Sequence, residues 1–242
     1  MRSTGRRTCS NMLGRARLSV MLSRPPPPQM FRSFVAISLI VGLSVLIEGA
    51  LFAADHGWMG KPRWRGVAYQ NGAFWAGLLH GWRPNYTAQP WVMFVSYAVL
   101  HGGIWHLLGN MLTLIVLARI LAAYISPRRI VVLYALSAIG GALCFGLLTR
   151  SPQPMVGASG ALFGLVGAWQ YYRWIELRRA GRSRWPVWRT LLGLVLLNII
   201  MWITLDGLLA WETHLGGIIT GATGAACLVW IRPAPSKDMN SY

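Results

Sequence analysis

The stretch that decides the fold reads Gly157-Ala158-Ser159-Gly160-Ala161-Leu162-Phe163-Gly164. It lies near the start of an apolar segment, residues 155 to 172, which is about long enough to cross a bilayer as a helix. Polar groups inside a membrane are costly and are usually functional. Glycine on both sides of Ser159 permits a tight turn and a close backbone approach. Ser159 is therefore a candidate nucleophile at the beginning of a membrane helix.

Five further apolar runs of similar length flank this segment. They cover residues 34 to 54, 107 to 125, 130 to 149, 187 to 205 and 214 to 231. Lipid permits only helices or closed barrels, and these runs lack the alternation of barrel strands. The sequence thus predicts an all-α membrane protein with six transmembrane helices. Glu48 falls inside the first run, where we expect it either to pair near the outer end or to reach water.

The charge of the chain fits a membrane surface better than nucleic acid. The formal net charge is +17, but 55% of the 242 residues are hydrophobic and only 12% are charged. Most Arg and Lys residues fall before the first run, between runs two and three, between runs four and five, and after the last run. The positive-inside rule then places both termini in the cytoplasm. We expect the lipid bilayer, and no nucleic acid, as a partner.

Three regions complete the predicted organisation around a membrane domain at 34–231. Residues 1–33 are rich in Arg and contain no acid, which is typical of a disordered cytoplasmic tail and also of a transit peptide. Met21 and Met30 leave a later start open. Residues 55–100 form a long outer connection whose five tryptophans favour the membrane interface. Residues 232–242 form a short cytoplasmic tail.

The predicted orientation brings four polar side chains to the same face of the bilayer. Runs two, four and six all cross from outside to inside. Ser159 and His214 lie near the beginnings of runs four and six, and His106 and Asn110 lie at the beginning of run two. At about 1.5 Å rise per residue, each lies within a turn or two of its helix start. One such residue alone is more often a packing residue, but the joint occurrence at one depth favours catalysis.

Ser159 and His214 have the chemistry of a nucleophile and its base. Serine needs a base to take its proton, and neutral imidazole titrates near working pH. The other histidines are His56, His80, His101 and His106. Glu212 lies about 200° around the helix from His214, and Asp206 lies across a loop. The sequence therefore predicts a Ser-His dyad without a carboxylate, with packing, including Phe163 one turn below Ser159, holding the imidazole.

An oxyanion site is predicted beside this dyad. His106 and Asn110 are four residues apart and share one helix face. Gly157 allows the backbone to approach closely, and the N–H of Ser159 is free at a helix N-terminus. Small residues in both helices predict close contact in lipid. They are Gly160, Gly164, Gly167 and Ala168 in run four, and Gly217, Gly221 and Gly224 or Ala225 in run six.

Three motifs, taken together, resemble the rhomboid family of intramembrane serine proteases. They are His101-Gly-Gly-Ile-Trp-His106-Leu-Leu-Gly-Asn110, the stretch from Gly157 to Gly164, and His214-Leu-Gly-Gly217-Ile-Ile-Thr-Gly221. The resemblance implies a six-helix bundle that cleaves transmembrane segments of single-span membrane proteins. It assigns Ser159 as nucleophile, His214 as base, and His106, Asn110 and the Ser159 N–H as oxyanion donors. It also implies that run five and the connection 206 to 213 control substrate access.

One departure from the family pattern and two alternative functions remain. The family often has Trp-Arg before its first His, where this chain has Val92 and Met93, so the anchoring of the outer loop is open. A catalytically silent rhomboid-like protein that binds membrane helices is the first alternative, although such proteins usually lack Ser or His. A transporter is the second, although its polar site would lie near the midplane.

Cofactors and location follow from the same residues. Cys9, Cys144 and Cys227 are odd in number and far apart, which argues against a disulfide framework or a zinc site, and no cofactor is expected. Mitochondrial members of the family usually carry an additional span before the core, and none is evident here. The sequence therefore favours a bacterial inner membrane. The substrate, the cleavage site and the oligomeric state stay open.

Overall fold

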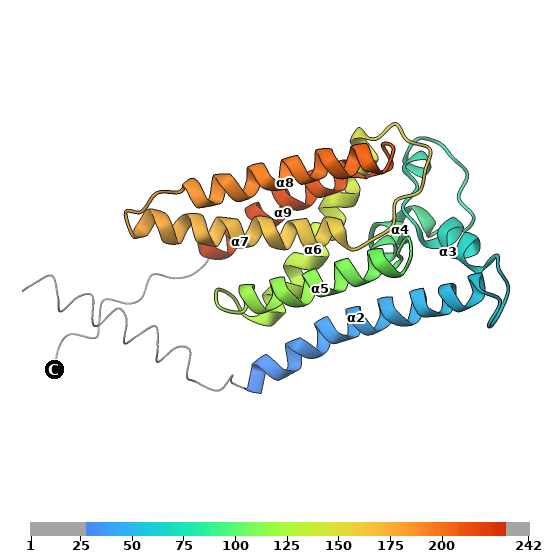
Figure 1. Cartoon of the computed structure of the whole chain (residues 1–242), viewed down its shortest axis with the longest axis horizontal. Helices are drawn as coiled ribbons and strands as arrows, with labels where there is room; N and C mark the ends of the chain where they lie inside the picture. Colours follow the sequence, from blue (N-terminus) through green and yellow to red (C-terminus); the bar gives the residue numbers. More distant parts are fainter. Residues whose placement is uncertain (1–27, 231–242) are drawn as a thin grey trace, which may run out of the picture.

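The computed structural model describes residues 28–230, and all the secondary-structure elements in that range are helices (Figure 1). The long helices are α2 (Pro28–Asp55), α5 (Ile104–Leu121), α6 (Pro127–Leu148), α7 (Ser159–Arg179), α8 (Trp185–Thr204) and α9 (Trp211–Trp230). Between α2 and α5 lie α3 (Trp64–Gly72), η1 (Ala76–Leu79), α4 (Gln89–Ser96) and η2 (Tyr97–Val99). The predicted all-α class is confirmed, and short helices occupy the outer connection.

The starts of two long helices, α2 and α7, differ from the starts of the apolar runs in the sequence. The first long helix already begins at Pro28, so residues 28–33 belong to it rather than to the basic tail. The rest of the tail, 1–27, and the C-terminal segment 231–242 lie outside the described residues. α7 begins at Ser159, as predicted, four residues after the start of the apolar run at 155, and Met155 instead pairs with Phe74 in an isolated antiparallel bridge. Residues 155 to 158 are therefore held outside the helix.

Within residues 28–230, four helices are long and apolar enough to cross a membrane, as expected for an integral membrane protein. They are Val35–Asp55 within α2, α5, α6 and α8. With 21 and 20 residues, α7 and α9 match them in length but are not among the four. Both have one face of glycines buried against protein, and α7 also has Gln170, Arg173 and Glu176. Helices shielded by protein need less apolar surface than helices that face lipid.

The centre of the bundle is built from backbone-to-backbone contact between α7 and α9. A Cβ added to Gly217 would overlap the carbonyl oxygen of Gly160, and one added to Gly221 would overlap that of Gly164. The predicted contact between these two helices is thus confirmed, except that Gly224 faces Leu133 of α6. Because lipid tails are as apolar as leucine, such close packing is what holds membrane helices together.

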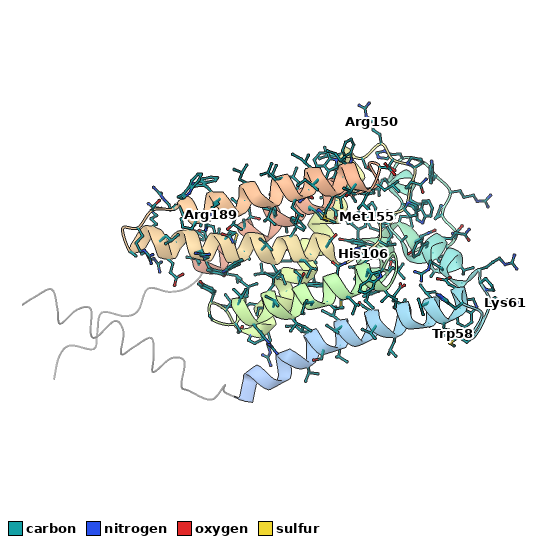
Figure 2. The ribbon with its side chains drawn as sticks, viewed as in Figure 1. Trp58, Lys61, His106, Arg150, Met155 and Arg189 are labelled. Carbon is teal, nitrogen blue, oxygen red and sulfur yellow. The ribbon has the colours of Figure 1, made fainter. Side chains whose placement is uncertain are left out.

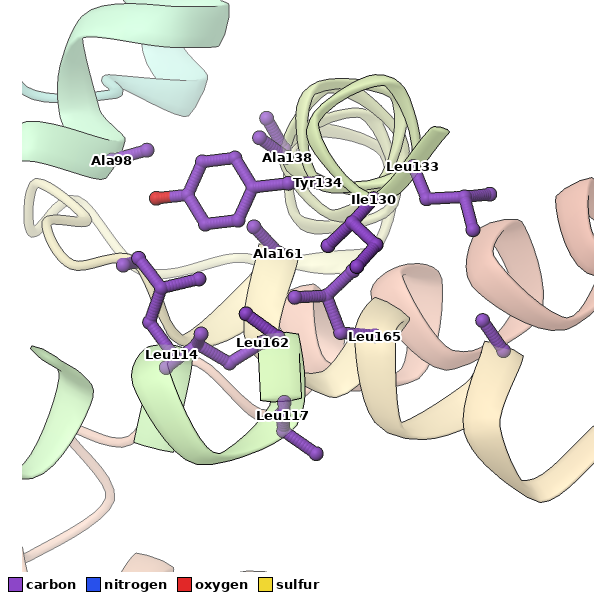
Figure 3. Close-up of a cluster of buried hydrophobic side chains, with 14 of the residues drawn as sticks. Ala98, Leu114, Leu117, Ile130, Leu133, Tyr134, Ala138, Ala161, Leu162 and Leu165 are labelled. Atoms are coloured by element: carbon purple, nitrogen blue, oxygen red, sulfur yellow. The ribbon is translucent and has the colours of Figure 1, made fainter. Parts of the chain in front are cut away.

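Larger apolar side chains fill the space on the other side of α7. Figure 3 shows Leu114 and Leu117 of α5, Ile130, Leu133 and Tyr134 of α6, and Ala161, Leu162 and Leu165 of α7 in one cluster. All of these side chains are buried. The cluster fixes α5 against α7, which holds the start of α5 beside the start of α7.

α8 is packed much more loosely than the central helices. Of its twenty residues only Val187 is buried, and most of its leucine, isoleucine and valine side chains are exposed. Figure 1 shows α8 on the opposite side of the bundle from α2. The surface of α8 is therefore apolar and suited to contact with lipid.

Arg65 of α3 anchors the outer segment to the bundle. Its guanidinium donates to both oxygens of Glu48 on α2, at 2.8 and 3.1 Å, and to Asp55 at 2.7 Å. It also donates to the carbonyl oxygen of His101, which accepts from Tyr69 as well. The hydrogen bonds to the two carboxylates, with that to Glu48 foremost, raise the pKa of Arg65, so the guanidinium stays charged.

This anchor answers two questions that the sequence left open. Glu48 has a fully buried side chain that is paired with Arg65, which is the first of its two expected states. The positions of the missing Trp-Arg pair lie on α4, where Met93 is fully buried and Val92 is exposed. The outer segment is thus attached through an arginine that lies elsewhere in the loop.

Candidate active site

Ser159 and His214 meet where α7 and α9 begin. His214 Nε2 lies 2.9 Å from Ser159 Oγ, within hydrogen-bond distance. Ser159 is the first residue of α7, and His214 lies in the first turn of α9, so the glycine contacts lower in both helices set this distance. The predicted proximity of the two side chains is confirmed. His214 is buried, whereas Ser159 is partly exposed.

Two further side chains hold the His214 ring. Phe163 stacks on it with centroids 4.0 Å apart and an interplanar angle of 5°, as expected from its position one turn after Ser159. Asn198 of α8 places its Oδ1 atom 2.5 Å from Nδ1 of the same ring. The role of Asn198 was not predicted from the sequence, because a lone amide in an apolar run carries no motif and its partner helix is unknown in advance.

None of the other histidines takes the place of His214 beside Ser159. His56 bonds the carbonyl oxygen of Phe52, and His80 bonds that of Gly146. His101 is fully buried with its ring 5.3 Å from that of His106. Burial, helped by the nearby His106, lowers the pKa of His101 to about 4, so its imidazole is neutral near pH 7. Of the five histidines, all within the described range, only His214 hydrogen-bonds Ser159.

The predicted oxyanion donors His106 and Asn110 lie beside Gly157, two residues before Ser159. The N–H of Gly102 donates to Nδ1 of His106 at 3.2 Å, so the imidazole proton resides on Nε2. Nε2 of His106 lies 2.8 Å from the position that a Cβ on residue 157 would occupy, and Nδ2 of Asn110 lies 3.9 Å from the same position. Both donors therefore face the backbone just before Ser159. One Asn110 hydrogen already bonds the His106 carbonyl oxygen, which leaves its second hydrogen for another acceptor.

Gly157 gives this site space rather than a donor. Its φ of +123° is unfavourable for a residue with a side chain, and a Cβ there would collide with the His106 ring. Its N–H donates to the carbonyl oxygen of Tyr97 at 3.0 Å and is therefore occupied. The N–H of Ser159 is different, because the first N–H groups of a helix have no partner within the helix.

Backbone pairing fixes the segment before Ser159. Phe74 and Met155 exchange two hydrogen bonds of 3.0 and 2.9 Å. Figure 2 shows Met155 and His106 toward the end of the bundle that carries Lys61 and Arg150, with Arg189 toward the other end. The site therefore lies near one end of the helices and not at their midpoint.

A cavity of about 590 Å³ opens beside the pair. It lies between α8 and α9, with His214, Asn198 and Phe163 among its lining residues. The other lining residues are Leu191, Leu194, Val195, Ile199, Trp202, Trp211, Leu215 and Ile218. An apolar side chain fits this space better than a charged one.

Comparison with known proteins places this site in a family. Residues 88–231 match the family model described as the Rhomboid domain. The chain is 30% identical to RHOMBOID-like protein 2 of Arabidopsis thaliana over 172 residues, which cover 67% of this chain and 44% of that protein. It is 29% identical to Rhomboid protease GluP of Bacillus subtilis (strain 168) over 142 residues, 57% of this chain and 26% of that protein. Rhomboid-related protein 2 of Mus musculus is 28% identical over 144 residues, 60% of this chain and 42% of that protein. The matched region thus spans less than half the length of each of these relatives.

Proposed function

Because the chain belongs to the rhomboid family, we propose that it is an intramembrane serine endopeptidase that cleaves transmembrane segments of membrane proteins. The observation that carries the proposal is the 2.9 Å contact between Ser159 Oγ and His214 Nε2. A serine hydroxyl within hydrogen-bond reach of an oriented imidazole is the signature of an activated nucleophile. Two relatives from Bacillus subtilis are named as rhomboid proteases, one of them as putative.

The proposed reaction uses four groups of this chain. Ser159 Oγ attacks the scissile carbonyl carbon while His214 Nε2 takes the hydroxyl proton. The carbonyl oxygen gains negative charge and receives hydrogen bonds from His106 Nε2, Asn110 Nδ2 and the Ser159 N–H. The imidazolium then gives its proton to the leaving amine, and an acyl-enzyme forms. Water, activated by the same imidazole, releases the second product and restores Ser159.

The proposed substrates are single-span proteins whose helix unwinds near the cut, since an intact helix hides its carbonyl groups. Exposed His106 and partly exposed Ser159 allow water to approach from the nearby end of the bundle. We place this end outside the cytoplasm, with both termini inside, on the strength of the arginine distribution. Relatives occur in a plant, a mouse and a bacterium, so the bacterial membrane favoured by the sequence stays a prediction.

The proposal also includes six spans. At about 1.5 Å per residue, the 21 and 20 residues of α7 and α9 reach roughly 30 Å, the thickness of the hydrocarbon core. Their glycine faces are covered by α6 and by each other. We therefore assign them as central spans, surrounded by the four apolar helices.

The experiment is cleavage of a single-span test substrate by the full chain in liposomes. Ser159→Ala and His214→Ala should each lower the rate by about 10³-fold or more. Ser151→Ala and His56→Ala are matched controls in exposed positions and should cleave like the wild type. A fluorophosphonate probe should label the wild type and not Ser159→Ala.

Two outcomes would overturn the proposal. Cleavage that survives Ser159→Ala would exclude the assigned nucleophile. A wild-type protein that neither cleaves several substrates nor labels with the probe would favour the alternative of a silent protein that binds membrane helices.

A further inference from the structure

The amide of Asn198 has a fixed orientation toward His214. Its Nδ2 atom donates to the carbonyl oxygen of Leu194 at 2.8 Å, one turn earlier in α8. A carbonyl oxygen only accepts hydrogen bonds, so the atom that faces Leu194 is the NH₂ group. The oxygen of the amide therefore faces the imidazole, where it lies 2.5 Å from Nδ1.

This orientation determines where the imidazole proton resides. The amide oxygen has no hydrogen to give, so Nδ1 of His214 must carry the proton and donate it. Nε2 of the neutral ring then presents a lone pair to Ser159 Oγ, 2.9 Å away. Only this tautomer lets the ring take the hydroxyl proton. His106 has the opposite tautomer, since its Nδ1 accepts from Gly102.

From this geometry we infer that Asn198 is a positioning residue that holds His214 in the tautomer required of a general base and ties this state to the seating of α8. The inference rests on the proposed roles of Ser159 and His214. It replaces the expectation that packing alone holds the imidazole. A neutral amide does so without burying a carboxylate, which is costly in the membrane.

The position of Asn198 on α8 adds a second consequence. α8 has one buried residue and a mostly exposed apolar surface, so displacement costs little packing. Phe163 stacks on the ring face but offers no hydrogen-bond acceptor, so it cannot select a tautomer. When α8 moves away from α9, His214 therefore loses the group that selects its tautomer, although its contact with Phe163 is kept.

The test reads the tautomer directly and the rate separately. The full chain is labelled with ¹⁵N-histidine in lipid nanodiscs above pH 8, and the His214 signals are assigned by their loss in His214→Gln. We expect the proton on Nδ1 in the wild type and in Asn198→Asp, which keeps an acceptor oxygen. We expect a mixture of tautomers in Asn198→Leu, which is nearly isosteric. Leu196→Ala, which shortens an exposed side chain on α8 outside the cavity lining, is the matched control and should match the wild type.

Cleavage kinetics give the second measurement. Asn198→Leu should lower kcat by about 10²-fold with little change in KM, less than the 10⁴-fold that the wrong tautomer costs in the Ser-His-Asp template. Asn198→Asp should recover most of this loss, and Leu196→Ala should lose little.

The outcomes separate this inference from the proposed function. An Nδ1 proton that is absent in the wild type or unaffected by Asn198→Leu would overturn the positioning role, and so would a kcat for Asn198→Leu equal to that of Leu196→Ala. A protein that does not cleave or label refutes the proposed function, while the nitrogen spectrum still decides whether Asn198 sets the tautomer.

Discussion

The α7–α9 interface and α8 show two ways of holding a helix in a membrane bundle. α7 and α9 touch through glycine backbones, so a single methyl group at Gly217 or Gly221 has no room. α8 has bulky apolar side chains with only Val187 buried. Ser159 and His214, which are 2.9 Å apart, lie on the tight pair, and Asn198 lies on the loose helix.

The difference between these two regions shows that the distance between Ser159 and His214 is fixed by the tightly packed helices. Proton transfer requires two atoms at a fixed distance, and backbone contact fixes distances better than flexible side chains do. Because lipid competes equally well for leucine and isoleucine, an apolar surface alone does not seat α8. A helix held in this way can be displaced at little packing cost, which suits the proposed cleavage of membrane helices.

The largest expected effect comes from breaking the tight interface. Gly221→Val places a branched side chain against the carbonyl oxygen of Gly164, where even a Cβ overlaps. We expect a loss of about 3 kcal/mol or more in the free energy of unfolding, the upper end of overpacking costs, together with loss of cleavage. Reversible unfolding in bicelles measures it. A variant within about 1 kcal/mol of wild type would show that this contact is not rigid.

A smaller effect is expected in the outer segment, which uses charge instead of close packing. Arg65→Gln leaves the buried Glu48 carboxylate without its cation. We expect a loss of about 2 kcal/mol, below the cost of breaking a fully buried pair because the Arg65 side chain is 22% exposed. Arg63→Gln, in an exposed neighbouring position, is the control and should be neutral.

A double variant separates pairing from a general loss of the loop. Arg65→Gln combined with Glu48→Gln removes the stranded charge and should recover part of the stability. If the double variant is as unstable as the sum of the two single variants, the pair is not coupled in the way that the structure indicates.

The smallest effect is expected on α8. A Cβ added to Gly193 meets nothing within 4 Å, so Gly193→Ala should be tolerated and should stabilise the helix by about 0.5–1 kcal/mol. The same unfolding assay applies. A destabilisation comparable to that of Gly221→Val would mean that α8 is packed as tightly as α9, and the contrast between the two regions would fail.

The sequence predicted what depends on local pattern and missed what depends on the partner helix. Ser159, His214 and the glycines along α7 and α9 have fixed spacings, so their meeting followed from helix geometry and topology. Asn198 and Arg65 each act through a residue 16 or 17 positions away, in another element, and no spacing rule announces such pairs. The start of α7 at Ser159 was predicted, but the bridge between Phe74 and Met155 was not, because it joins segments that are distant in the chain.

The separation of 55 residues between Ser159 and His214 also orders events during synthesis. At about 5–20 residues per second, translation needs roughly 3 to 11 seconds to pass from the serine to the histidine. Throughout that interval the nascent chain holds a hydroxyl with no base beside it. A ribosome that stalls within α8 therefore leaves a product that lacks the base of the proposed reaction. Under that proposal, the ability to cut other proteins arises only once α9 has been made.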